Sequence, residues 1–259
     1  MKDLDIIYQY YKSLYDQNLP LKGFNVDKDA DGNRIILPEK LFGYIVDYYG
    51  FNGFPEIVSD EEFNAINCKK LYRGYKDFDH GANSLLHYKY HYGTGCLMGI
   101  GMYFSDCDAI AAQYTKSSAH EEKDWKRVLK VKLDSNNFLS FGELNKLKLM
   151  NSGDLPRGTK HKYIEKIKEL EEFKKEHEGD GELIDSFMRN MRINSIFAVY
   201  LGVDYIYHPT IGYRVVYNRG IIKTTQAEKD KFVKNSEHYR DGAYDFHDCV
   251  YPNDNVEKA

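Results

Sequence analysis

The sequence predicts an α+β fold, in which a β-sheet core carries an N-terminal helical lobe and a helical insertion. Short apolar runs of strand length lie at 71–74, 99–105 and 128–133, whereas segments of helical period lie at 2–16 and 141–198. The chain has 259 residues, of which 42% are hydrophobic and 29% are charged. This composition is that of a globular protein, and the length allows one sizeable core or two small ones.

Composition also limits the classes of function. The net charge of −4 gives no overall attraction for nucleic acid, although a local basic patch stays open. The chain has no apolar run of about 18 residues, so we expect no membrane span. Residues 1–12 lack the apolar segment of a signal peptide. The cysteines form no C-x-x-C pair, which predicts reduced thiols in a cytoplasmic, intracellular protein, with leaderless secretion left open.

Three helices are predicted before residue 68. The helix at 2–16 has an apolar face made of Leu4, Ile7, Tyr8, Tyr11 and Leu14. The second begins near Pro38, which suits a first helical turn, and ends at Gly50. Ser59 and Glu62 have the spacing of a capping box, which predicts the start of the third helix.

A calcium site is not predicted between the first two helices. The run DKDADGN at 27–33 begins like a calcium loop, but its twelfth position is Pro38 where such a loop needs a Glu. The run therefore favours a polar turn. No other metal site is expected in the chain.

The middle of the chain alternates strands and helices. Apolar and basic side chains alternate at 128–133, which predicts a half-exposed strand. Helical stripes follow, made of Tyr163, Ile167 and Leu170 and then of Leu183, Ile184, Phe187, Met188 and Met191. The mixed charges at 160–178 favour a solvated helix face, with acceptor contacts through Lys160, Lys162, Lys166 and Arg157 as the alternative.

The last part of the chain is predicted to be a pair of strands followed by a tail. Gly202 ends the helical segment, and strands follow at 203–207 and 213–217. The sequence Asn-Arg-Gly at 218–220 predicts a hairpin after the second of them. Residues 226–259 are polar with scattered aromatics and favour a peripheral tail.

Residues 71–114 contain the groups with the clearest chemical capability. Glycines at 93, 95, 99 and 101 let a backbone approach a ligand closely, because no Cβ stands in the way. Arg73, at a strand end beside Gly74, can present a fixed cation to a phosphate or carboxylate. Tyr103 and Tyr114 lie eleven residues apart, which permits two aromatic faces to converge. Together these residues favour a cleft for a flat ring with an anionic tail.

Three motifs in this order resemble those of the ADP-ribosyltransferase superfamily. LYRGY at 71–75 is similar to the first motif, and GIGMYFSDCDAIAAQY at 99–114 is similar to the second, a strand followed by a helix that ends in a ring-stacking Tyr. GYRVVYNRGIIK at 212–223 resembles the third. The resemblance implies a split β-sheet core at 68–225 with a helical insertion at about 141–200, an N-terminal lobe at 1–67, and a tail at 226–259.

The resemblance also implies the roles of single residues. The backbone of Gly74 would contact the nicotinamide amide, and Tyr103 and Tyr114 would enclose the nicotinamide ring. Arg73 would hold the phosphate or ribose side of NAD+, and Ser105 would supply a nearby hydroxyl. NAD+ is then a substrate, and no metal is implied.

The sequence departs from the family pattern at two positions. Ala111 stands where the poly-ADP-ribosyl members have a Ser, and Tyr213 stands where the third motif has its catalytic Glu, or Gly212 if the register slips by one. Strand alternation keeps Tyr213 on the face that the Glu would occupy. Transfer of a single unit is therefore expected rather than chain elongation. Asp204 and His208 are the candidates to replace the missing carboxylate.

The function that this resemblance implies is mono-ADP-ribosyl transfer from NAD+ to a protein side chain or a nucleic-acid base. Such a chain would suit a bacterial or phage conflict toxin with an antitoxin or regulatory protein as its partner. The alternatives are a degenerate NAD-binding module without turnover and an NAD glycohydrolase. The sequence has no Walker loop and no G-x-S-x-G elbow, and His247-Asp248-Cys249 favours a solvated tail.

Overall fold

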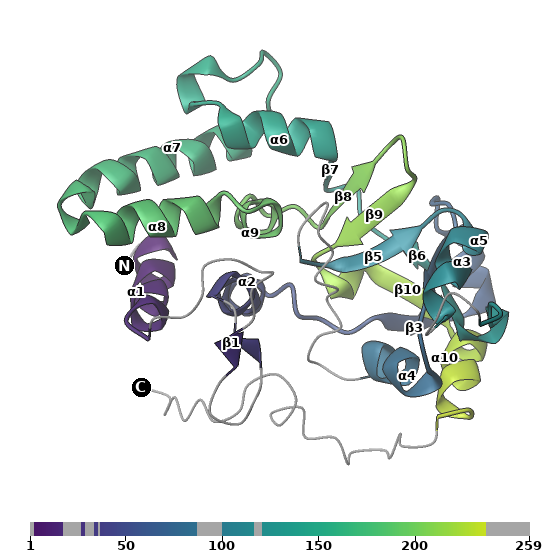
Figure 1. The fold of residues 1–259 in the computed structure, drawn as a ribbon. Helices are drawn as coiled ribbons and strands as arrows, with labels where there is room; N and C mark the ends of the chain where they lie inside the picture. Colours follow the sequence, from purple (N-terminus) through teal and green to yellow (C-terminus); the bar gives the residue numbers. More distant parts are fainter. Residues whose placement is uncertain are drawn as a thin grey trace. The chain divides into compact units, whose positions relative to one another are not determined.

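A computed structural model describes residues 3–17, 27–28, 34–35, 37–86, 100–116 and 121–236. The fold is mixed α+β and contains an eight-stranded mixed sheet, which confirms the predicted class (Figure 1). Internal contacts divide the chain into two compact units. The first unit comprises residues 1–51, 92–103 and 135–218, and the second comprises residues 52–91, 104–134 and 219–259. The predicted boundaries at residues 67 and 225 stay a prediction.

Helices form most of the first unit. The predicted N-terminal helix is α1 (Asp3–Tyr15), and all five residues of its apolar face are buried. The second helix is α2 (Leu37–Tyr48), after which Gly50 takes a positive φ of 70°. The predicted helical insertion contains α6 (Phe141–Leu149), α7 (His161–Glu176), α8 (Glu182–Met191) and α9 (Asn194–Tyr200). The described part of the loop between α1 and α2 contains β1 (Asp27–Lys28) and β2 (Arg34–Ile35), while residues 29–33 of the calcium-like run lie outside the described residues.

Aromatic side chains join aliphatic ones in the core of the first unit. Figure 1 shows α7 and α8 as neighbours, and the rings of Phe173 and Phe187 on these helices lie 5.7 Å apart. Tyr8 of α1 packs edge-on against both rings. The Tyr11 hydroxyl lies 2.7 Å from the Ser186 hydroxyl, which gives one buried polar group a partner. The predicted apolar stripes therefore do face a common core.

The strands of the first unit lie side by side in the order β7-β8-β9. Strand β7 (Phe138–Ser140) runs parallel to β8 (Tyr205–His208), which pairs antiparallel with β9 (Tyr213–Val216). Gly202 follows α9 with a φ of 69°, as the predicted helix end requires. The predicted strands at 203–207 and 213–217 are thus confirmed as β8 and β9.

The second unit contains the strand order β3-β10-β6-β4-β5. These strands are β3 (Glu56–Val58), β10 (Ile222–Thr225), β6 (Val128–Leu133), β4 (Leu71–Gly74) and β5 (Met102–Ser105), whose first two residues belong to the first unit. Strand β10 is parallel to β3 and antiparallel to β6. The hairpin predicted at 218–220 is wrong, because these residues lead into a 3₁₀ turn, η5 (Arg219–Ile221), and then into β10.

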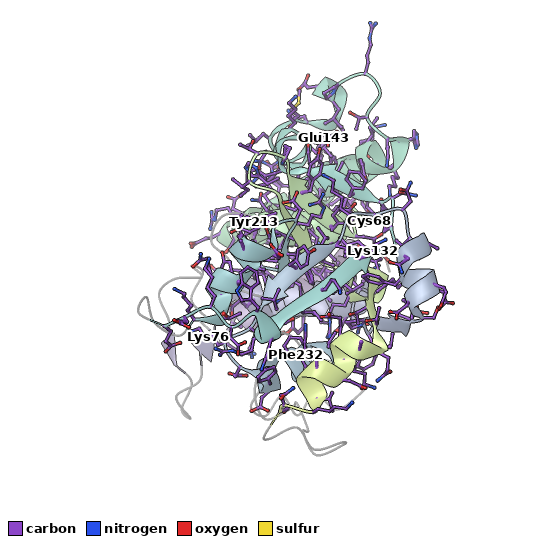
Figure 2. The ribbon with its side chains drawn as sticks, turned by 90° about the vertical axis from the view of Figure 1, so that its right-hand side faces the viewer. Cys68, Lys76, Lys132, Glu143, Tyr213 and Phe232 are labelled. Atoms are coloured by element: carbon purple, nitrogen blue, oxygen red, sulfur yellow. The ribbon has the colours of Figure 1, made fainter. Side chains whose placement is uncertain are left out.

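Capped helices flank these strands. Helix α3 (Asp60–Ala65) begins with the predicted capping box of Ser59 and Glu62. Helix α10 (Gln226–Val233) is capped by the Thr225 hydroxyl and buries Phe232 fully against α4 (Phe78–Leu86), so the interpretation of 226–259 as a tail is wrong for these eight residues (Figure 2). Helix α5 (Asp108–Ala111) follows β5 and continues as the 3₁₀ turn η1 (Ala112–Thr115). A further 3₁₀ turn, η2 (Trp125–Arg127), precedes β6.

The prediction that residues 128–133 form a half-exposed strand is wrong. Lys132 is only 7% exposed, although it is the polar member of the alternation (Figure 2). Its ammonium group donates to the carbonyl oxygens of Asn64 and Ile66, at 3.3 and 2.8 Å, at the C-terminal end of α3. A basic side chain suits a helix C-terminus, where carbonyl groups lack intrahelical partners. The strand therefore has side chains buried on both faces.

Within the described residues, no helix is long and apolar enough to cross a membrane.

Candidate functional site

The candidate site residues are distributed over the two units. Arg73, Gly74, Ser105 and Tyr114 belong to the second unit, and Tyr103, Asp204, His208 and Tyr213 belong to the first. The structure brings together the members of the second-unit set through β4, β5 and the α5–η1 segment. It brings His208 and Tyr213 together in the first unit.

Gly74 lets β4 approach α5 closely. A Cβ at this position would lie 2.0 Å from the carbonyl oxygen of Ala111 and 3.2 Å from a methyl carbon of Thr115. No side chain fits such a gap, so the glycine of the first motif is required by packing whatever it contacts in a ligand. The same approach places the end of β4 beside the segment that carries Tyr114.

Arg73 presents its cation over an aromatic ring. The guanidinium carbon lies 5.3 Å from the centre of the Tyr75 ring, which is within the range of a cation–π interaction. The residue is half-buried on β4. An Arg held in this way loses little conformational freedom when its fork of N–H groups binds a phosphate or carboxylate.

Tyr114 is an exposed ring on a well-anchored turn. Its exposed fraction is 57%, whereas the following Thr115 is fully buried. The Thr115 hydroxyl donates to the carbonyl oxygen of Ala112 at 2.8 Å and accepts from the Asp124 amide at 2.9 Å. These bonds fix η1, so the Tyr114 ring stands on a defined backbone and offers a face for stacking.

Ser105 has a local structural partner. It is 2% exposed at the end of β5, and its hydroxyl oxygen accepts a hydrogen bond from the Cys107 amide at 3.0 Å. Strand β5 pairs with β4 here, with Ser105 opposite Tyr72. The hydroxyl therefore shapes the turn from β5 into α5, which favours a supporting role over direct ligand contact.

Tyr103 and Tyr213 both pack against the core of the first unit and are half-buried. Tyr103 also lies close enough to Tyr217 to affect its ionisation. Burial, and after it the neighbouring Tyr103, raises the pKa of Tyr217 well above its ordinary value. Tyr213 is the first residue of β9 and stands where the third motif would have its Glu.

His208 lies directly across the β8–β9 pair from Tyr213. Its imidazole stacks on the ring of Phe141, with ring centres 5.5 Å apart and an interplanar angle of 24°. The Nδ1 atom is buried and has no hydrogen-bond partner among the described residues. An imidazole nitrogen in this state can accept a proton or a hydrogen bond from a bound molecule. Sequence reasoning missed Phe141, although the capping box of Ser140 and Glu143 would have placed it at the start of α6.

The carboxylate of Asp204 accepts hydrogen bonds from other side chains of the protein. One oxygen accepts from the Ser135 hydroxyl, and the other accepts from the Asn218 side-chain amide at 2.7 Å. Its carbonyl oxygen also accepts from the backbone amides of Tyr217 and Asn218. Asp204 therefore joins the ends of β8 and β9 to the segment before β7, which favours a structural role.

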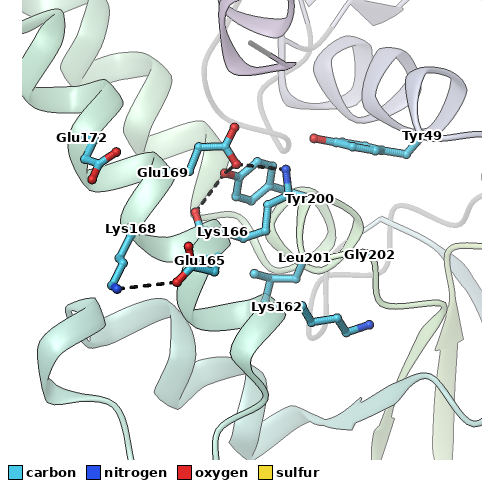
Figure 3. Close-up of a pocket in the computed structure, with 10 residues that line it drawn as sticks. All are labelled: Tyr49, Lys162, Glu165, Lys166, Lys168, Glu169, Glu172, Tyr200, Leu201 and Gly202. Atoms are coloured by element: carbon cyan, nitrogen blue, oxygen red, sulfur yellow. Dashed lines mark hydrogen bonds and ion pairs between the residues drawn. The ribbon is translucent and has the colours of Figure 1, made fainter.

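A cavity of about 660 Å³ lies on α7 in the first unit (Figure 3). Lys166 and Glu169 form an ion pair across 3.0 Å at its wall, and the Tyr200 hydroxyl lies 3.0 Å from the same carboxylate. The Tyr49 hydroxyl is buried without a hydrogen-bond partner among the described residues. Lys162 and Lys166 both line this cavity, and most charged residues of the run at 160–178 are exposed, as a solvated helix face requires.

Within the part of the chain that the structure describes, no three His, Cys, Asp or Glu side chains form a group that could hold a metal ion. The glycines at 93, 95 and 99, and His247-Asp248-Cys249, lie outside the described residues. The chain matches no protein-family model, no curated protein and no solved structure. The resemblance to ADP-ribosyltransferases therefore rests on the three motifs.

Proposed function

We propose that this protein is a mono-ADP-ribosyltransferase that uses NAD+ as its donor. The observation that supports this most is the adjacency of the first two motifs in the second unit. Strand β4 pairs with β5 at Tyr72 and Ser105, and Gly74 packs on the α5–η1 segment that carries Tyr114. Arg73 and Tyr114, about forty positions apart in the chain, thus supply a cation and an exposed aromatic ring from neighbouring segments.

The reaction places specific demands on these residues. The bond between nicotinamide and the ribose carbon breaks, and a bond between that carbon and the acceptor forms, through a state in which the ribose carries positive charge. By the motif resemblance, Arg73 would hold an anionic part of NAD+, and Tyr103 and Tyr114 would each contribute a ring for the flat leaving group. Binding that holds the donor in a bent form exposes the reacting carbon.

The acceptor must lose a proton as the new bond forms, and His208 is the residue we propose to take it. The motif Glu is replaced by Tyr213, and the carboxylate of Asp204 is already bonded to Ser135 and Asn218. The buried Nδ1 of His208, opposite Tyr213, has no partner that would compete for the proton among the described residues. Without a carboxylate beside the ribose, one unit is transferred and elongation does not follow.

The same observations favour a second candidate function. The absence of the motif Glu, together with the bonded state of Asp204, suits an NAD-binding module that does not turn over. NAD hydrolysis, with water as the acceptor, is the third possibility. We propose the transferase because Arg73, Gly74 and Tyr114 retain their place in the motif order.

The test supplies NAD+ labelled in its adenine ring to purified protein and a cell lysate, with half of each sample then treated with nuclease and half with protease. We expect label in a macromolecule, and the treatment that removes it identifies the acceptor class. Arg73→Gln should abolish the label, while Lys76→Gln, at an exposed position in the same unit, should retain it. Nicotinamide release without label would indicate hydrolysis, and neither product would support the binding module.

A transferase of this kind would act on a macromolecule of a competing cell or phage. We therefore propose a conflict-toxin role, with a neutralising protein as its partner in the producing cell. Expression in bacteria tests the role: Arg73→Gln should relieve growth arrest that the unchanged chain causes.

A further inference from the structure

A second, smaller cavity lies among the four helices of the first unit. It has a volume of about 250 Å³ and is bounded by α6, α7, α8 and α9. The lining side chains at its base are apolar and almost fully buried, each between 2% and 6% exposed: Leu147, Ile167, Leu170, Met188 and Phe197. Cavities between helices of a bundle are common ligand sites, and this one is below the size that suits a drug-sized molecule, roughly 300 Å³. It suits a small ligand with a compact apolar body.

The rim of this cavity is basic. Lys148, Lys174 and Arg192 line it, and the only carboxylate among the lining residues is that of Glu171. Glu171 is already engaged, because its two oxygens accept from the amide and the hydroxyl of Ser152. Lys174 pairs with Asp185 across 3.2 Å, outside the cavity lining. With three basic side chains and one carboxylate among the lining residues, the wall carries a net positive charge.

Lys148 differs from Lys166 and Lys168 of the larger cavity on α7, whereas Lys162 of that cavity likewise donates to a neutral amide oxygen, that of Asn137. In that cavity, Lys166 pairs with Glu169 at 3.0 Å and Lys168 pairs with Glu165 at 3.6 Å. The Lys148 ammonium instead donates to the neutral side-chain oxygen of Asn194 and has no carboxylate partner among the described residues. Burial lowers the pKa of Lys148, which reflects the cost of holding this charge away from water.

We propose that this cavity binds a small organic anion with an apolar body, such as a medium-chain carboxylate. The anionic group lies against Lys148 and Arg192, and the apolar body lies on Met188, Leu147 and Phe197. An anion there would balance a partly buried cation and form charge-assisted hydrogen bonds. The proposal concerns a site apart from the motif residues and does not depend on transferase activity.

The test follows the methionine methyl signals by NMR while hexanoate is added to the full chain. Met150 and Met188 line the cavity and report on its occupation, whereas Met102 lies on β5 and serves as an internal control. We expect saturable shifts of the first two signals with a dissociation constant of about 1 mM or tighter, as ordinary ligand efficiencies give for a molecule of this size. Acetate, which lacks the apolar body, and hexylammonium, which reverses the charge, should produce no saturable shift.

Substitutions of the basic side chains test whether hexanoate binding depends on recognition of its carboxylate. The double variant Lys148→Gln with Arg192→Gln should weaken hexanoate binding by about tenfold or more, since charge-assisted bonds are lost. Lys146→Gln, at an exposed position on the same helix, should bind as the unchanged chain does. Equal binding of hexanoate and hexylammonium, unchanged affinity in the double variant, or no shift of Met150 and Met188 would each overturn the proposal.

Discussion

At the scale of single residues, the absence of a Cβ at Gly74 lets β4 approach α5 closely. We predict that Gly74→Ala lowers the free energy of unfolding by about 3 kcal/mol, because its Cβ would lie 2.0 Å from the Ala111 carbonyl oxygen. Urea denaturation measures this. Gly142→Ala, where no atom lies within 4 Å of the added Cβ, should leave stability unchanged or raise it by up to about 1 kcal/mol.

This prediction affects how the first motif is tested. If Gly74→Ala unfolds the second unit, lost activity in that variant carries no information about contact with nicotinamide. If Gly74→Ala proves as stable as the unchanged chain, the close packing of β4 on α5 is contradicted, and a ligand becomes the reason for the glycine.

The second prediction for a single residue concerns the imidazole of His208. His208→Asn should slow nicotinamide release about 100-fold or more, in line with the loss of a general base, because it removes the side chain that we propose takes the acceptor proton. His161→Asn is the matched control, since the His161 side chain is 85% exposed and pairs with Glu165 in the following turn. A rate for His208→Asn equal to that of the control would exclude His208 from proton transfer.

The burial of Lys132 could not be predicted from the alternation of apolar and basic residues on β6. Alternation of apolar and basic residues on β6 predicts that the basic ones face water, and Lys130 does so in part, at 37% exposed. Lys132 is instead buried under the C-terminal end of α3, where two carbonyl groups accept from it. The pattern gives the strand and its period, but a long aliphatic stem lets a Lys stay buried when its ammonium finds acceptors.

At the scale of secondary-structure elements, the start of α6 depends on one capping box. The Ser140 hydroxyl accepts from the Glu143 amide at 3.2 Å, and the Glu143 carboxylate accepts from the Ser140 amide and hydroxyl at 2.7 Å. We predict that Ser140→Ala costs about 1 kcal/mol of unfolding free energy near neutral pH. The exposed Ser13→Ala should change it by less than about 0.5 kcal/mol.

The stabilisation by the same capping box should depend on pH. The hydrogen bonds from Ser140 lower the pKa of Glu143, so the folded state favours the ionised carboxylate. This stabilisation is present above the ordinary Glu pKa of about 4.3 and is lost as the pH falls through the lowered value. The difference between the unchanged chain and Ser140→Ala should therefore shrink below about pH 4. A difference that stays constant down to pH 3 would contradict the cap.

Elements with local signals could be predicted, and elements set by distant pairing could not. The capping boxes of α3 and α6 are visible as Ser-x-x-Glu patterns, and Gly202 marks the end of α9. The Asn-Arg-Gly turn at 218–220 looked like a hairpin, yet β10 pairs with β3 and β6. Strand partners depend on contacts far along the chain, which a local turn pattern does not encode.

At the scale of the whole molecule, the tyrosines set the response to alkaline pH. Burial is the main cause that raises the pKa of seven buried or half-buried tyrosines: Tyr8, Tyr11, Tyr44, Tyr49, Tyr163, Tyr200 and Tyr217. A raised pKa means that the folded state keeps the proton longer than the unfolded chain does. The stabilisation is complete below about pH 10 and is lost as the pH rises toward the raised values.

We therefore predict that the free energy of unfolding is constant between about pH 7 and 9 and falls steadily between about pH 10 and 12. Denaturant titrations at each pH measure this. Tyr217→Phe should make the fall less steep, because Tyr217 is fully buried. The control is Phe42→Leu, which alters the same core without removing a titrating group. Equal slopes for Tyr217→Phe and the unchanged chain would contradict the assignment.

The candidate site could be predicted only in part. The first two motifs lie on adjacent strands, β4 and β5, whereas the roles of their residues stay a prediction from the resemblance. The sequence could not indicate that Ser105 would bond to Cys107, or that Asp204 would be held by Ser135 and Asn218. Side chains with chemical capability are used for turns as readily as for catalysis, and only three-dimensional contacts separate the two uses.

The most direct test of the central claim measures nicotinamide release from NAD+ by the purified chain and by two exposed tyrosine variants. Tyr114→Ala should keep the stability of the unchanged chain, because the ring is 57% exposed. The rate of nicotinamide release should fall about 10-fold or more, because stacking on the ring is lost. Tyr48→Ala, at a ring that is 36% exposed on α2, should release nicotinamide at the unchanged rate. Equal rates for Tyr114→Ala and Tyr48→Ala, or no release by the unchanged chain, would contradict the proposed transferase.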